Sequence, residues 1–335
     1  MKKILCIFLV SILLLSTLVL TSCDKEPEKN EDEKLKFGMG VLNYYESATN
    51  ATEDVNGSGS AVSTVAAVLL DSEGKIVKCE FDTIQTTAEY TAKGKFISKD
   101  SFATKYELGS NYGMKSEYGS KKEWFEHADA FKALTVGKTI EDVKKLVAEN
   151  GKGTDDVIAA GCTIDISDFV LAIEKAVKNA KASNAVKSNT LKVAAVTEQS
   201  GYDATEEKTG SIELQTSFVA AVTDADGKVV VSVNDCVQVK FAFDTNGAAA
   251  TDTTAAIKTK LELGDNYNMK SEYGSKKEWY EHAAAFDQTC VGKTSSQIAG
   301  LVTEDGESAE VLQNAGCTIA VSGMVKAAVK ATKTK

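Results

Sequence analysis

The stretch MKSEYGSKKEW occurs twice without a change, at residues 114–124 and again at 269–279. Shorter segments recur at the same distance of 155 residues: ELG, VGKT and AGCTI begin at Glu107, Val136 and Ala160, and again at Glu262, Val291 and Ala315. A repeat of this period predicts a tandem duplication of a domain, because the units of solenoid proteins are several-fold shorter. Any small-molecule site is therefore expected twice.

Two domains of ordinary size account for a chain of 335 residues. We predict a first domain at 36–182, a short linker at 183–190 and a second domain at 191–335. Each domain begins with two β-like segments around a turn signal, which predicts a hairpin. These segments are 62–70, DSEG and 75–87 in the first copy, and 218–222, DADG and 228–243 in the second.

Helical patterns follow the hairpin in both copies. In residues 121–133 the side chains of Trp124, Ala128 and Phe131 share one stripe, and residues 139–148 begin with a capping signal. A last amphipathic helix is predicted at 167–180, with its counterpart at 324–331. Strands followed by helices predict an α+β fold with an antiparallel sheet followed by helices in each copy, rather than a doubly wound sheet.

The N-terminus has the pattern of a signal peptide at residues 1–22: Lys2 and Lys3 precede an apolar run that is short for a permanent membrane span. Its end, LTSC, resembles the lipobox of bacterial lipoproteins, which implies a lipid on Cys23. Two or more acyl chains hold a protein stably at a membrane. The charged segment 23–35 then reads as a tether, and we expect the protein at the extracellular face of the cell membrane.

Composition excludes several classes of function. The chain has a net charge of −10 and no Arg, so it lacks the side chain that best recognises phosphates and bases, and nucleic acid is not expected as a partner. No CxxC or His/Cys cluster is present, which argues against structural zinc and covalent haem. No GxSxG elbow, GxGxxG turn or Ser/His/Asp arrangement can be assigned from the sequence. VGKT lacks the earlier glycine of a P-loop, so it predicts only a turn and a helix start. We expect the cysteines beyond Cys23 to be small buried residues, because their number is odd and only two repeat.

The segment AGCTI, at 160–164 and 315–319, resembles the flavinylation sequence of proteins that carry FMN through a phosphoester to threonine. That sequence has a small residue, Gly, a small residue, Thr and an aliphatic residue, with an acid upstream. The resemblance implies Thr163 and Thr318 as attachment sites. The neighbouring site residues are Gly161, Gly316, Cys162 and Cys317, and Asp156 and Glu310 are the upstream acids.

The whole mature chain resembles the two-domain flavin lipoproteins of Gram-positive extracellular electron transfer, some of which also yield a peptide pheromone from the signal peptide. The resemblance rests on the lipobox, the tether, the repeated KxELGxxYxMKSEYGSKKEW, VGKT, and AGCTI before a last helix. It implies an electron carrier rather than an enzyme, with two covalent FMN groups. It further implies a flavin transferase, electrons from membrane donor proteins or a quinol pathway, and ferric iron or another external acceptor.

Further side chains are candidates for contacting the flavin. Trp124 and Trp279, beside Tyr118 and Tyr273, are candidates to stack on the ring or else to anchor the core, and Tyr112 and Tyr267 are also ring candidates. His127 and His282 are either proton relays or partly buried structural residues. Lys115, Lys121, Lys122 and their counterparts Lys270, Lys276 and Lys277 either meet the phosphate or form a solvated face.

Two other functions fit part of the pattern. One is a solute- or peptide-binding lipoprotein without a redox cofactor, in which the two copies act as clamps. The other is a surface adhesion or structural protein. Flavin absorbance and mass distinguish both from an electron carrier.

Overall fold

Two antiparallel sheets organise residues 33–333, the part of the chain that the computed structural model describes. The predicted signal peptide, Cys23 and most of the predicted tether lie outside these residues. The first sheet has the order β4-β3-β2-β1-β5, with β1 (Lys36–Thr49), β2 (Gly57–Leu70), β3 (Ile76–Tyr90), β4 (Phe96–Ile97) and β5 (Lys181–Ala182). The second has the order β6-β7-β8, with β6 (Thr190–Tyr202), β7 (Gly210–Thr223) and β8 (Val229–Phe243).

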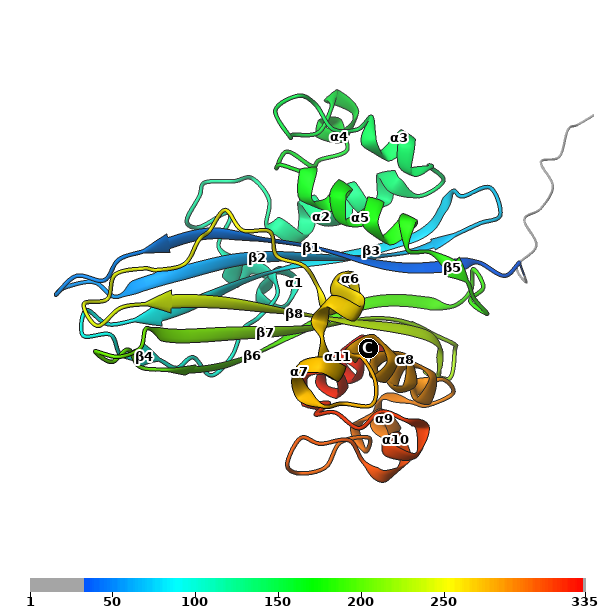
Figure 1. Cartoon of the computed structure of the whole chain (residues 1–335). Coiled ribbons are helices and arrows are strands. Elements are labelled where there is room, and N and C mark those ends of the chain that lie inside the picture. Colours follow the sequence, from blue (N-terminus) through cyan, green and yellow to red (C-terminus); the bar gives the residue numbers. More distant parts are fainter. Residues whose placement is uncertain (1–32, 334–335) are drawn as a thin grey trace, which may run out of the picture. The chain divides into compact units, whose positions relative to one another are not determined.

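Helices follow the strands in the same order in both halves of the chain (Figure 1). The first half has α1 (Lys105–Leu108), η1 (Gly109–Tyr112), α2 (Trp124–Thr135), α3 (Ile140–Lys144), α4 (Asp155–Ala159) and α5 (Ser167–Lys178). The second half has α6 (Lys260–Leu263), η2 (Gly264–Tyr267), α7 (Met269–Tyr273), α8 (Trp279–Cys290), α9 (Ser295–Ala299), α10 (Glu310–Ala315) and α11 (Ser322–Thr332). The predicted α+β class, with antiparallel strands followed by helices, is confirmed. None of the helices in the described region has the length and hydrophobicity to cross a membrane.

Both predicted hairpins are present, as β2–β3 and β7–β8. The turns lie at equivalent places: Asp71 Oδ1 accepts from the backbone of Glu73 and Lys75, and Asp224 Oδ1 from that of Asp226 and Lys228. These turns are 153 residues apart, whereas the helical segments are 155 apart, because the second half has two more residues between its last long strand and its first helix. VGKT forms the expected turn, with Gly137 at φ +81° and Thr139 as the N-cap of α3.

Strands β1 and β6 were absent from the sequence prediction. Gly38 and Gly40 interrupt the pattern of β1, and the structure shows why small residues are needed there. A Cβ on Gly38 would lie 2.1 Å from the carbonyl oxygen of Ala176, and one on Gly40 would lie 2.4 Å from the backbone nitrogen of Ala176. Helix α5 thus packs directly on the backbone of β1.

Each sheet buries both faces. The inner faces of the two sheets pack against each other and form one shared core, in which the ring centres of Tyr90 and Phe243 stack at 4.4 Å. The outer face of the first sheet packs against α2 and α5, where the rings of Phe81 and Phe169 stack at 4.4 Å. The outer face of the second sheet packs against α8 and α11. The predicted linker is packed as well, since the fully buried Ala185 accepts a backbone hydrogen bond from Leu35.

Candidate functional site

The AGCT loop that follows α4 presents the hydroxyl-bearing side chain of Thr163 at the surface. Cys162 beside it is fully buried in the core between sheet and helices, and its backbone donates to Val157. Thr318, after α10, is equally exposed, and Cys317 is equally buried. In both copies the cysteine therefore anchors the loop while the threonine faces solvent. Burial raises the pKa of both thiols, so they are packing groups rather than reactive thiolates.

Two side chains fix the backbone of this loop: Lys122, just before α2, and His127, in the first turns of α2. Lys122 Nζ donates to the carbonyl of Gly161 at 3.0 Å. The Nδ1 atom of His127 lies 3.0 Å from the same carbonyl and 3.3 Å from the backbone nitrogen of Thr163, so it serves one of the two according to its tautomer. Ser120 Oγ lies 3.3 Å from the other ring nitrogen of His127. The backbone on both sides of Cys162 is thereby held by Lys122, which belongs to the repeated stretch, and by His127 of α2.

The second half repeats these contacts to the loop. Lys277 Nζ donates to the carbonyl of Gly316 at 3.0 Å. His282 Nδ1 lies 3.2 Å from that carbonyl and 3.3 Å from the nitrogen of Thr318, and Ser275 Oγ lies 3.3 Å from its Nε2. The two predicted histidines thus contact the loop of the predicted flavinylation sequence in both halves.

Both histidines are only 2% exposed. Burial lowers the pKa of His127 and of His282, while the hydrogen bond to the loop carbonyl acts in the opposite direction. A neutral imidazole is therefore expected at neutral pH, able to accept from one backbone group or donate to another. This geometry assigns them a positioning role at the loop.

The loop glycine is required by the backbone and by the lysine. Gly161 has φ +101° and Gly316 has φ +95°, a region that side chains other than glycine rarely adopt. A Cβ at Gly161 would lie 2.1 Å from Lys122 Nζ, and one at Gly316 would lie 2.2 Å from Lys277 Nζ. The lysine approaches the carbonyl only because that space is open.

The identical stretch MKSEYGSKKEW is a loop of turns in the first half and begins with the short helix α7 in the second, and in both halves its own glutamate closes it. Glu123 makes a capping box with Glu126 at the start of α2 and also accepts from the backbone of Met114 at 3.1 Å. Glu278 does the same in the second half and accepts from Met269 at 2.8 Å. The tip of the loop carries Tyr118 and Tyr273, which are 78% and 74% exposed.

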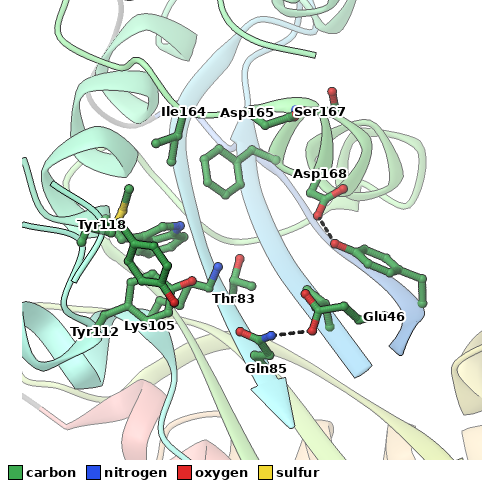
Figure 2. Close-up of a pocket in the computed structure, with 15 residues that line it drawn as sticks. Glu46, Thr83, Gln85, Lys105, Tyr112, Tyr118, Ile164, Asp165, Ser167 and Asp168 are labelled. Atoms are coloured by element: carbon green, nitrogen blue, oxygen red, sulfur yellow. Dashed lines mark hydrogen bonds between the residues drawn. The ribbon is translucent and has the colours of Figure 1, made fainter. Parts of the chain in front are cut away.

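A pocket of about 610 Å³ lies beside the AGCT loop in the first half (Figure 2). Ile164 and Asp165, which follow Thr163 directly, line its edge. Figure 2 shows Lys105, Tyr112 and Tyr118 gathered on one side, with Glu46 and Gln85 on another. Pockets that hold small organic ligands have volumes of roughly 300–1,000 Å³.

Trp124 lines this pocket but belongs to the core. It is 3% exposed, and its ring meets Tyr106 and Phe169 edge to face at 5.2 and 5.7 Å. Trp279 is 4% exposed in the equivalent place. Tyr112 lines the pocket and is half-buried, so it is better placed than Trp124 to meet a ligand ring.

The upstream acids differ slightly from the sequence assignment. Glu310 is the first residue of α10, and the first residue of α4 is Asp155. Asp156, one position further along, is therefore not the counterpart of Glu310. Both first residues are exposed and lie at a helix N-terminus, which favours negative charge.

Lys105 is a site residue that sequence reasoning missed. Its ammonium lies 4.7 Å from the centre of the Tyr112 ring and 5.6 Å from that of Trp124. Lys260 lies over Tyr267 and Trp279 at 4.8 and 5.5 Å. The signal was present, because both lysines begin the repeated KxELG segment, but nothing in the sequence shows that this segment meets the aromatic residues.

The described residues contain no group of three His, Cys, Asp or Glu side chains arranged to hold a metal. Cys79, Cys162, Cys236, Cys290 and Cys317 are all buried and free. No protein-family model, curated protein or solved structure matches the chain.

Proposed function

We propose that this protein is a lipid-anchored electron carrier at the extracellular face of the membrane, with one covalent FMN in each half of a duplicated chain. Thr163 and Thr318 are the attachment sites. The supporting observation is the repeated loop: an exposed threonine follows a glycine whose carbonyl is held by a lysine and a histidine, and the first copy adjoins a pocket of ligand size.

The residues fit a flavin in the first half. Thr163 offers a solvent-accessible hydroxyl, and the pocket next to it has an aromatic side, Tyr112 and Trp124, with the ammonium of Lys105 over both rings. A flavin transferase joins Thr163 Oγ to phosphorus; the hydroxyl loses its proton, and the leaving group of the activated flavin nucleotide takes the electron pair of the broken P–O bond. FMN supplies the one- and two-electron chemistry, and the protein supplies position and charge.

Covalent attachment suits the proposed location, because a reversibly bound cofactor is lost by dilution outside the cell. The tether would let the folded part reach both membrane electron donors, fed by a quinol pathway, and external acceptors such as ferric iron. The protein would relay electrons without converting a substrate of its own.

The test uses the secreted soluble chain made together with a flavin transferase. We expect flavin absorbance and a mass increase of two FMN groups. Thr163→Val and Thr318→Val, which keep the shape of the side chain but remove the hydroxyl, should each lose one group. Thr163→Ser and Thr318→Ser should retain it.

A colourless protein of unmodified mass in the presence of active transferase would refute the proposal and favour a solute- or peptide-binding lipoprotein. The double Thr→Val variant should also stop the reduction of ferric iron by intact cells while the protein remains folded. An adhesion or structural protein predicts no loss.

A further inference from the structure

We infer that the two flavin sites are not equivalent: Lys105 and Tyr112 are free to bond the flavin ring in the first half, whereas Lys260 and Tyr267 are held by two glutamines in the second. This inference rests on the proposed function. It assigns Lys105 and Tyr112 as ligand-contacting residues and predicts that the two flavins respond differently to loss of the same pair.

The first half leaves this pair without hydrogen-bond partners. Within residues 33–333, the ammonium of Lys105 has ring contacts but no hydrogen bond or ion pair, and the hydroxyl of Tyr112 has none either. Both residues line the pocket beside Thr163. Both groups face an open pocket without a protein partner, so they are available to a ligand with matching acceptors.

In the second half, the equivalent residues Lys260 and Tyr267 both have hydrogen-bond partners. Tyr267 donates its hydroxyl proton to Gln238 Oε1 at 2.9 Å. Lys260 is 7% exposed and donates to Gln215 Oε1 at 3.4 Å. The amide nitrogen of Gln238 completes the network by donating to Gln215 at 3.2 Å and to Glu213 at 2.7 Å.

One sequence difference accounts for much of this contrast. Gln215 pairs with Gln238 across strands β7 and β8, and at the equivalent place Val62 pairs with Gln85 across β2 and β3. Valine offers no acceptor to Lys105. Gln85 instead donates to Glu46 at 2.5 Å, away from Tyr112.

Among the described residues, no carboxylate that lines the first pocket forms an ion pair with Lys105. Glu46 accepts from Ser60 at 2.6 Å as well as from Gln85, and Asp168 accepts from the hydroxyl of Tyr44 at 2.7 Å. Asp165 accepts from the backbone of Ser167. The ammonium therefore remains available to negative charge on a ligand.

A flavin ring gains negative charge when it is reduced, so a free ammonium and hydroxyl bind the reduced ring more strongly than the oxidised ring. Losing a tenfold preference of this kind lowers the potential of a two-electron couple by about 30 mV. The second half should lack this dependence on its lysine and tyrosine hydroxyl, because those donors are already engaged.

The experiment measures each flavin separately by redox titration followed by visible absorbance. Thr318→Val leaves only the first flavin, and Thr163→Val leaves only the second. In the first protein, Lys105→Met and Tyr112→Phe should each lower the potential by about 30 mV, a tenfold change in preference. In the second protein, Lys260→Met and Tyr267→Phe should shift the potential by less than half as much.

Reciprocal exchange provides the matched control. Gln215→Val removes the acceptor of Lys260 and should make the second flavin sensitive to Lys260→Met, and Val62→Gln should reduce the sensitivity of the first flavin to Lys105→Met. Equal shifts in both halves, or no shift in the first, would overturn the inference. These outcomes differ from failure of the proposed function, in which no FMN mass is found on either threonine.

Discussion

Replacing Gly161 by alanine should destabilise the AGCT loop through two separable effects. The backbone at φ +101° costs an alanine about 1–2 kcal/mol. The new Cβ, 2.1 Å from Lys122 Nζ, also forces the lysine away from the Gly161 carbonyl. A hydrogen bond from a charged donor contributes about 1.5–3 kcal/mol, and we take the lower end because Lys122 is partly exposed. The sum is about 3 kcal/mol.

Urea denaturation and intact mass measure the two consequences: lost stability, and a lower fraction of flavin on Thr163 when the transferase is present. Gly119→Ala is the control, because Gly119 also has a positive φ, +66°, but no atom within 4 Å of the added Cβ. It should cost about 1 kcal/mol. In a Lys122→Ala background, Gly161→Ala should lower the unfolding free energy only by the cost of the positive φ, about 1–2 kcal/mol. The reasoning is refuted if Gly161→Ala costs no more than Gly119→Ala, or if its cost is the same without the lysine.

Three further predictions concern stability. Burial raises the pKa of Asp235 to about 7, so the folded protein favours the protonated carboxyl. The contribution of this carboxyl to stability is full below about pH 4 and is lost as the pH rises toward 7. In urea titrations, the gain in unfolding free energy from Asp235→Asn should therefore increase over that range. Burial lowers the pKa of His127, so the loop should be most stable above about pH 6.5, and the exchange protection of the Thr163 amide should fall below it. Phe131→Ala, at a fully buried position in α2, should cost about 3–5 kcal/mol of unfolding free energy, whereas Val136→Ala, 52% exposed, should change it by less than about 0.5 kcal/mol.

Local patterns in the sequence were sufficient for the elements that bury one face. The stripe of Trp124, Ala128 and Phe131 correctly predicted α2, and the alternation after DSEG correctly predicted the hairpin. Strand β1 was missed because Gly38 and Gly40 lower its β-propensity. Glycine is needed at both positions because Ala176 of helix α5, more than 130 residues later, packs against their backbone.

The site was predictable only in part. AGCTI and the histidines are visible as repeats, but the bond from Lys122 to Gly161 joins residues 39 positions apart, and no local pattern reports it. The pocket depends equally on long-range packing, since it brings Tyr44 on β1 and Lys105 on α1 together. The difference between Val62 and Gln215 is visible in the sequence. Its effect on the neighbouring lysine follows only from the cross-strand pairs that the structure shows.

The core shared by the two sheets limits how this chain can be shortened, in the laboratory or in evolution. Met39 and Val65 on the inner face of the first sheet lie in one cluster with Phe218 and Phe241 of the second. Gly59 carries no side chain at a point where a Cβ would lie 2.1 Å from the Phe241 ring, so the two surfaces are fitted closely to each other. Removal of either half would expose a broad apolar sheet face, which promotes aggregation. Covering that apolar face is therefore a reason to retain both halves of the chain, whatever each half binds.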